Sequence, residues 1–255
     1  MARKTDDTDS IAQHLADTPR QTGRRLRGAV ADLLGIAIVS GRIAPGERLE
    51  GEVASAEALN VSRSAYREAM QVLAAKGLVT SKPKDGTRVL PRHHWNMLDP
   101  MVLGWAFTGE PDLGFVRDLF ELRSIVEPAV ARLAAQRRSE AELAALRAEL
   151  ATMVREGLAS EEGRAADRRF HECMLQASRN EAMMALSASI GAAVGFTTLF
   201  KSRKRGIARD PVPDHARVLD AIAAGDAQGA HDAMRDLVDL ALADTRAVMA
   251  QAPQG

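Results

Sequence analysis

The chain has 255 residues, 46% of them hydrophobic, which is enough for two domains with cores of their own. Its formal net charge is zero, but residues 1–92 carry 15 basic and 11 acidic residues whereas the rest carry 19 and 23, so the first part is the basic one. A single cysteine, Cys173, excludes an intramolecular disulfide and is expected to be a small core residue, and no apolar run approaches the length of a membrane span. We therefore expect a cytoplasmic protein, and the low aromatic content of 4% favours a mainly helical one.

The N-terminal part begins with a polar segment. Residues 1–22 are too polar to bury much surface, and we expect a disordered arm there. Apolar periodicity predicts a helix over residues 24–40, which Gly41 stops, and a second short helix over residues 53–59.

A third helix is predicted to follow Asn60, and it carries two arginines one turn apart. Ser62 is a good N-cap, and Arg63 and Arg67 share one face while apolar residues line another. Guanidinium groups suit phosphate oxygens and the paired acceptors of guanine in the major groove. Taken alone, however, the pattern fits an ordinary amphipathic helix with a solvated arginine face better.

The next segment predicts a β-hairpin. Leu78–Ser81 and Thr87–Leu90 have strand character around a basic turn, in which Gly86 is free to adopt a positive φ. Three helices followed by a hairpin is the order of a winged helix-turn-helix domain, which we place at residues 23–92.

Three runs in this domain, Gly41–Leu49, Val61–Met70 and Ala75–Val79, resemble the DNA-binding domain of GntR-type bacterial transcription regulators. The resemblance implies that double-stranded operator DNA is a partner. The residues that it places on DNA are Ser62, Arg63, Ser64, Arg67 and, in the wing, Gly86. Family members usually carry arginine at the position of Val53, so the operator contacts of this chain are expected to differ there.

Residues 93–250 predict a helical domain. The expected helices are 100–107, 113–136, 139–156, 161–177, 181–203, 212–224 and 227–249. Gly191 and Gly195, four residues apart, suggest close helix packing. The expected fold is therefore mainly α, with an N-terminal winged helix-turn-helix and a C-terminal antiparallel all-α bundle.

A candidate metal site lies within this bundle. Asp167 and His171 are four residues apart on one helix and project from the same face, and His215 on a later helix is able to close the site across the bundle. Oxygen and nitrogen ligands fit zinc, nickel, manganese or iron about equally. For Asp167 and His171 alone, a surface ion pair or a hydrogen-bonded histidine is the commoner explanation.

Three further runs, Asp167–His171, Ala177–Asn180 and His215–Asp226, are similar to the effector domain of the FadR branch of GntR regulators, called FCD. In that domain the aspartate and two histidines bind a divalent metal, and a third histidine follows where this chain has Leu237. The resemblance therefore implies a metal site with three protein ligands, completed by water or by an effector carboxylate. His231 is a less suitable substitute for the missing histidine.

Arg123 is the candidate effector-binding residue. Its alternative is a helical pair with Glu127 on an exposed face. The family resemblance instead implies that Arg123 points into a cavity toward an acidic ligand, a role that suits a guanidinium group. The segment around residues 91–105 resembles the galactonate-operon repressor group, which implies a small carboxylate, first a sugar acid, as effector.

The sequence thus predicts a homodimeric repressor, and not an enzyme. Two alternatives remain open. One is a metal-dependent hydrolase or isomerase that uses Asp167, His171 and His215, although no motif supplies a general base beside them. The other is a DNA-binding protein that responds to no ligand.

Overall fold

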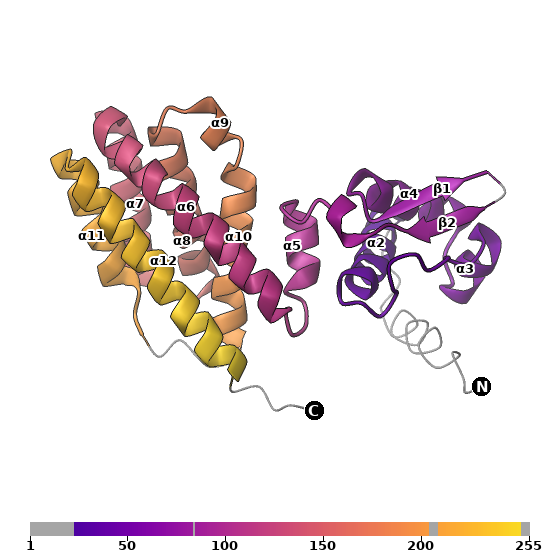
Figure 1. Ribbon diagram of the computed structural model, residues 1–255. Helices are drawn as coiled ribbons and strands as arrows, with labels where there is room; N and C mark the ends of the chain where they lie inside the picture. The colour runs from indigo at the N-terminus through magenta and orange to yellow at the C-terminus, as the bar shows by residue number, and fades with distance from the viewer. Residues whose placement is uncertain (1–22, 84, 204–208, 251–255) are drawn as a thin grey trace. The chain divides into compact units, whose positions relative to one another are not determined.

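The computed structural model describes residues 23–83, 85–203 and 209–250, and side chains from Gly28 onward, so the arm expected at 1–22 lies outside the described residues. These residues form two compact units that divide between Gly109 and Glu110. Figure 1 shows the first unit in indigo to magenta and the second, helical unit from α6 to α12. Within the described ranges, no helix is both long and apolar enough to cross a membrane.

The first unit has the predicted winged helix-turn-helix order. Its elements are α2 (Gly23–Val39), α3 (Glu52–Ala58), α4 (Arg63–Ala75), β1 (Val79–Lys82), β2 (Gly86–Val89), the 3-10 helix η1 (Arg92–His94) and α5 (Pro100–Ala106). β1 and β2 pair antiparallel, with Val79 opposite Val89. The sequence did not predict the isolated bridge between Arg48 and Arg88, which ties the segment before α3 to the hairpin.

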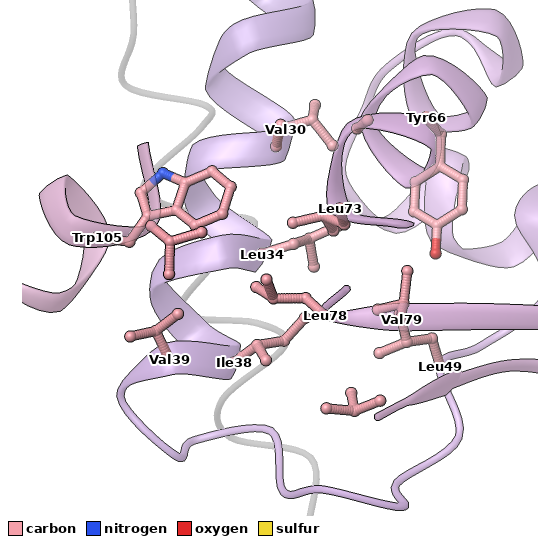
Figure 2. Packing of buried hydrophobic residues seen from close by; sticks show 14 of the residues in the cluster. Val30, Leu34, Ile38, Val39, Leu49, Tyr66, Leu73, Leu78, Val79 and Trp105 are labelled. Carbon is pink, nitrogen blue, oxygen red and sulfur yellow. The ribbon is translucent and has the colours of Figure 1, made fainter. Parts of the chain in front are cut away.

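The core of this unit lies between α2, α4 and the hairpin (Figure 2). Ile38 on α2, Leu73 on α4 and Leu78 just before β1 are fully buried in it. Burial of each such side chain stabilises the fold by about 1.5–3 kcal/mol. The inner face of α4 is thereby fixed on the core, and its outer face is left to solvent.

The segment after residue 92 also belongs to the first unit. Trp95 and Trp105 are buried in its core, and the Trp105 indole Nε1 donates a hydrogen bond to Asp32 Oδ1 at 2.9 Å. A Cβ on Gly35 would lie 2.5 Å from the Trp105 ring, so α5 packs tightly on α2. The compact unit therefore extends to Gly109, beyond the boundary expected after residue 92, because the two tryptophans complete its core.

The second unit is the predicted helical bundle. Its elements are α6 (Leu113–Arg137), α7 (Glu140–Glu156), α8 (Glu161–Ala177), α9 (Glu181–Met184), α10 (Ser187–Arg203), α11 (Val212–Ala224) and α12 (Ala227–Ala250). The helix α12 packs along α6 and α11, while α8 packs against α7, α10 and α6. These contacts bring α6, α8, α10 and α11 around one interior.

Local chemistry explains where these helices begin. Ser139 and Glu142 form a reciprocal capping box at the start of α7, and Ser160 accepts a hydrogen bond from the Gly163 amide at the start of α8. One expectation was wrong: the helix predicted over residues 181–203 is divided into α9 and α10. No glycine or proline marks the break at Ala185–Leu186, so composition gave no sign of it.

The two glycines of α10 behave differently. A Cβ on Gly191 would lie 2.5 Å from Glu172 Oε1 and 3.0 Å from Arg168 Cγ, as close packing against α8 predicts. A Cβ on Gly195 would meet nothing within 4 Å. The expected close packing is therefore found at Gly191 and is wrong at Gly195.

Candidate DNA surface and candidate metal site

The outer face of α4 carries the residues that the sequence assigned to DNA. Ser62 caps the helix by accepting a hydrogen bond from the Ala65 amide at 3.2 Å, and its hydroxyl lies 3.0 Å from that of Ser64. Ser62, Arg63, Ser64 and Arg67 are all exposed, whereas the face formed by Ala65, Tyr66, Ala69 and Leu73 is buried. Four polar side chains, two of them cationic, thus lie together on the solvent side of one helix.

Arg67 is held by an acidic residue that the sequence did not indicate. Its Nη2 lies 2.8 Å from Glu52 Oε1 and its Nε 3.3 Å from Glu52 Oε2, in a bidentate pair. Glu52 opens α3, and Val53 beside it is 45% exposed, so this position faces solvent without a charge. The pair fixes the direction of the Arg67 guanidinium while leaving Nη1 to a further acceptor.

The wing shows the expected glycine conformation. Gly86 has a φ of +78° at the start of β2, a region that glycine adopts without strain. A Cβ there would lie 3.0 Å from Arg48 Nε, so the loop before α3 reaches the wing. Arg48 and Arg88 are therefore basic side chains at or next to the wing in addition to the predicted set.

The three candidate metal ligands come together in the helical unit. Asp167 and His171 lie one turn apart on α8, His215 lies on α11, and their ligand atoms are all within 4.8 Å of one another. Asp167 Oδ1 is 3.0 Å from His215 Nε2 and 3.6 Å from His171 Nε2. All three side chains are buried, so the surface ion pair considered for Asp167 and His171 is wrong.

A second layer of contacts orients both imidazole rings. His215 Nδ1 lies 2.8 Å from the carbonyl oxygen of Pro211, which can only accept, so the hydrogen bond requires the proton on Nδ1. His171 Nδ1 lies 2.5 Å from Glu127 Oε2. His215 Nδ1 is thus engaged by an acceptor, whereas His171 Nδ1 lies in close ion-pair contact with Glu127 but makes no well-formed hydrogen bond to it. In both rings Nε2 is the nitrogen turned toward Asp167.

Both carboxylates of this cluster have lowered pKa values. Burial opposes ionisation of Glu127, but Arg123 and His171 outweigh it and lower its pKa to about 2. Burial likewise opposes ionisation of Asp167, yet His215 and His171 hold its pKa well below the usual range. Thr198 on α10 donates to Asp167 Oδ2 at 3.1 Å and leaves Oδ1 facing the histidines.

This arrangement fits a cation. Asp167 Oδ1 and His215 Nε2 are buried and have no hydrogen-bond partner in the described part of the chain. With neutral imidazoles, two electron pairs face each other across 3.0 Å, which is repulsive unless a proton or a metal ion lies between them. Ligand atoms on one tetrahedral zinc ion are about 3.3 Å apart, between the two observed distances. Asp167, His171 and His215 are therefore the residues that would hold a divalent metal.

The remaining candidates have defined surroundings. Arg123 Nε lies 2.6 Å from Glu127 Oε1, and the two side chains are almost fully buried, so their pair is real but the exposed face considered for it is wrong. Leu237 is buried on α12. His231 lies 3.0 Å from Asp232 and does not belong to the ligand group found in the described residues. Cys173 is half-buried rather than a full core residue.

Two buried charged residues of this interior are not predicted by the sequence pattern. Glu127 is expected from its spacing only to pair with Arg123, but it also contacts His171. Lys201 on α10 is 7% exposed. Burial lowers the pKa of Lys201, and the carboxylates of Asp167 and Asp244 act in the opposite direction. The i, i+3 spacing from Thr198 was the signal available for Lys201, but it names no partner on another helix.

Comparison with known proteins matches both units to families. Residues 26–89 match the family described as bacterial regulatory proteins, gntR family, and residues 118–240 match the FCD domain. The galactonate operon transcriptional repressor of Escherichia coli (strain K12) is 37% identical over 62% of this chain and 69% of its own length. The regulator LutR of Bacillus subtilis (strain 168) is 32% identical over 77% of this chain and 90% of its own length.

A solved structure supports the fold. The protein Lar, described as controlling the expression of the Listeria monocytogenes agr system, covers 90% of this chain and 99% of its own at a TM-score of 0.62 and 22% identity. The matched families and these relatives are transcriptional regulators, so the hydrolase or isomerase alternative has no support among them.

Proposed function

Because the chain belongs to the GntR family, with an FCD domain after its DNA-binding domain, it is a DNA-binding transcriptional regulator, and we propose that it is a repressor controlled by a small carboxylate. A sugar acid is the first candidate, since a relative at 37% identity is named for a galactonate operon. A regulator acts on the chromosome, so we also place it in the cytoplasm.

The observation that carries this proposal is the buried polar cluster of the helical unit. The ligand atoms of Asp167, His171 and His215 lie within 4.8 Å of one another, and Glu127 and the Pro211 carbonyl orient the two rings. Orienting contacts of this kind are typical of metal-binding histidines. A protein that responds to no ligand has no use for such a costly buried cluster.

A bound divalent metal would offer its remaining coordination positions to the oxygen atoms of an acid. Because Leu237 supplies no ligand, one more coordination position of the metal is available to the effector. Arg123 contacts Glu127 through Nε, and its Nη1 and Nη2 atoms are suited to bind a carboxylate. Together these groups support recognition of a carboxylate that carries neighbouring hydroxyl groups.

For the DNA-binding unit we propose contacts through Ser62, Arg63, Ser64 and Arg67 of α4, with Gly86 in the wing. Their support is the exposed polar face of α4 above a buried core. We propose a homodimer, because two copies of α4 would then read two halves of a near-palindromic operator. An effector shifts this binding only by preferring one arrangement of the protein over another.

The test is operator affinity with and without acids. DNA from upstream of the gene and its neighbours is titrated with the protein in low salt, then again with D-galactonate, L-lactate and galactitol. We expect tight binding that weakens with the effective acid and not with galactitol, which lacks the carboxylate. Affinity that no acid changes would contradict the effector proposal and favour a ligand-independent DNA-binding protein.

A further inference from the structure

Lys201 is a buried cation of the helical unit to which the proposed function gives no role. It lies near the end of α10 and is 7% exposed. Thr198, one turn earlier, donates a hydrogen bond to Asp167 Oδ2. Residues three apart share a helix face, so Lys201 projects from the side of α10 that faces the metal-ligand cluster.

No carboxylate of the described chain neutralises Lys201 directly. Asp167 and Asp244 act on it electrostatically, but neither lies within ion-pair distance of its ammonium group in the described residues. Asp167 Oδ2 accepts a hydrogen bond from Thr198 and its Oδ1 faces His215, while Asp244 pairs with Arg209 at 3.2 Å. A cation on a largely buried side chain is costly when no anion lies beside it, so Lys201 is suited to an anion supplied from elsewhere.

A second buried cation, Arg123, acts electrostatically on Lys201. Arg123 is 3% exposed, and its positive charge is among those felt by Lys201. Its pairing with Glu127 through Nε neutralises it only in part, because the carboxylate of Glu127 also faces His171. Two buried like charges repel, and an anion that reaches both relieves the repulsion.

We infer that Lys201 and Arg123 together hold the carboxylate group of the effector, beside the Asp167–His171–His215 cluster. This inference rests on the proposed function and names a residue that selects the acid. The ammonium group supplies a compact charge and the guanidinium group a directional fork. The pair therefore distinguishes an acid from a neutral polyol with the same hydroxyl groups.

The experiment is thermal unfolding of the zinc-loaded full-length protein with increasing D-galactonate, gluconate, L-lactate or galactitol. Three proteins are compared: the wild type, Lys201→Met and, as a matched control, Arg203→Met, which removes an exposed cation from the same helix. Zinc content is measured for each. We expect acids to stabilise the wild type and Arg203→Met, with an apparent affinity at least about tenfold weaker in Lys201→Met, and galactitol to stabilise none of them.

The outcomes separate the inference from the proposed function. If Lys201→Met responds to the acids as the wild type does, Lys201 is not a ligand for the carboxylate, although the effector proposal stands. If no acid stabilises the wild type, both fall. If Lys201→Met loses its zinc, its weaker response reflects the metal site and the inference is overturned. Should Lys201→Met fail to fold, Lys201→Gln, which keeps a hydrogen-bond donor without the charge, takes its place under the same criteria.

Discussion

Glu127 contacts one residue of each site proposed for the helical interior. It is fully buried and contacts both Arg123 and His171, so it fixes a candidate effector residue and a candidate metal ligand at once. We expect Glu127→Gln to weaken zinc binding about 10- to 100-fold, because His171 loses the anion that orients its ring. Competition with a fluorescent zinc chelator measures this. Glu121→Gln, on the exposed face of the same helix, should bind zinc as the wild type does, and equal affinities for all three proteins would remove Glu127 from the site.

The sequence predicted the metal-site candidates better than their surroundings. Asp167, His171 and His215 were found because helical spacing and family motifs pointed to them, and the structure brings them together. The pairing of Glu127 with His171 joins α6 to α8, and no spacing within one helix reports a contact between two. The contact of Glu52 with Arg67 was not predicted for the same reason, because it joins two helices and the residues are 15 apart in sequence.

Arg67 provides the residue-scale test of DNA recognition. We expect Arg67→Ala to weaken operator binding about tenfold or more and to relax selectivity at one base pair, because a guanidinium reads a base edge through paired donors. Glu52→Gln should relax selectivity with a smaller loss of affinity, since Arg67 stays but loses its orienting partner. Titration of operator variants by fluorescence anisotropy measures both. Arg155→Ala, an exposed arginine of the helical unit, serves as control, and selectivity identical to that of the control would exclude Arg67 from base contact.

At the level of elements, periodicity and capping residues predicted most helix ends to within a residue or two. Ser62 gave a clear start, since a hydroxyl at the N-cap satisfies a free amide. The helix predicted from residue 139 begins one residue later, because Ser139 is its N-cap. The break between α9 and α10 was not predicted, because Ala185 and Leu186 are both good helix formers. Tertiary packing, which sequence patterns do not report, decides the path of the chain there.

The turn after α4 depends on Gly77. Its φ is +72°, and a Cβ there would lie 2.2 Å from the backbone oxygen of His94, which cannot move aside as a side chain can. We expect Gly77→Ala to lower the free energy of unfolding of the DNA-binding unit by about 2 kcal/mol or more. Gly28→Ala is the matched control, because it lies within α2 in open space and should stabilise by roughly 0.5–1 kcal/mol. Urea unfolding followed by tryptophan fluorescence distinguishes the two, and equal midpoints would contradict the close contact.

At the level of the whole molecule, the sequence predicted two units divided after residue 92, whereas the first compact unit extends to Gly109. The polar residues around Pro91–His94 look like a linker in the sequence, yet Trp95 and Trp105 that follow are buried in the first unit. The larger part of the chain, from α6 onward, then carries both proposed ligand sites. Binding of a metal there should therefore stabilise the helical unit directly.

Removal of the metal tests whether it stabilises the helical unit. A ligand that binds only the folded state stabilises it by about 2.7 kcal/mol when present at about one hundred times its Kd. We expect a chelator to lower the Tm of the full-length protein, and zinc to restore it. Asp167→Asn, which weakens the anionic ligand, should lose most of this response. Differential scanning calorimetry measures it, and a Tm that neither chelator nor zinc changes would leave the cluster as a protonated His–Asp network.

Dimeric reading of an operator makes a geometric prediction for the whole regulator. If two α4 helices bind successive major grooves on one face of DNA, their half-sites must keep a separation of about one helical turn, roughly 10 base pairs. Inserting about five base pairs between the half-sites turns one of them to the opposite face, so only one protomer can bind, and affinity should fall by more than tenfold. Substituting bases between the half-sites without changing their separation should alter affinity much less, because spacers are read mainly through DNA deformability. Analytical ultracentrifugation on each DNA supplies the stoichiometry: two protomers on the native spacing and one on the expanded spacing support the dimer, whereas one protomer on both contradicts it.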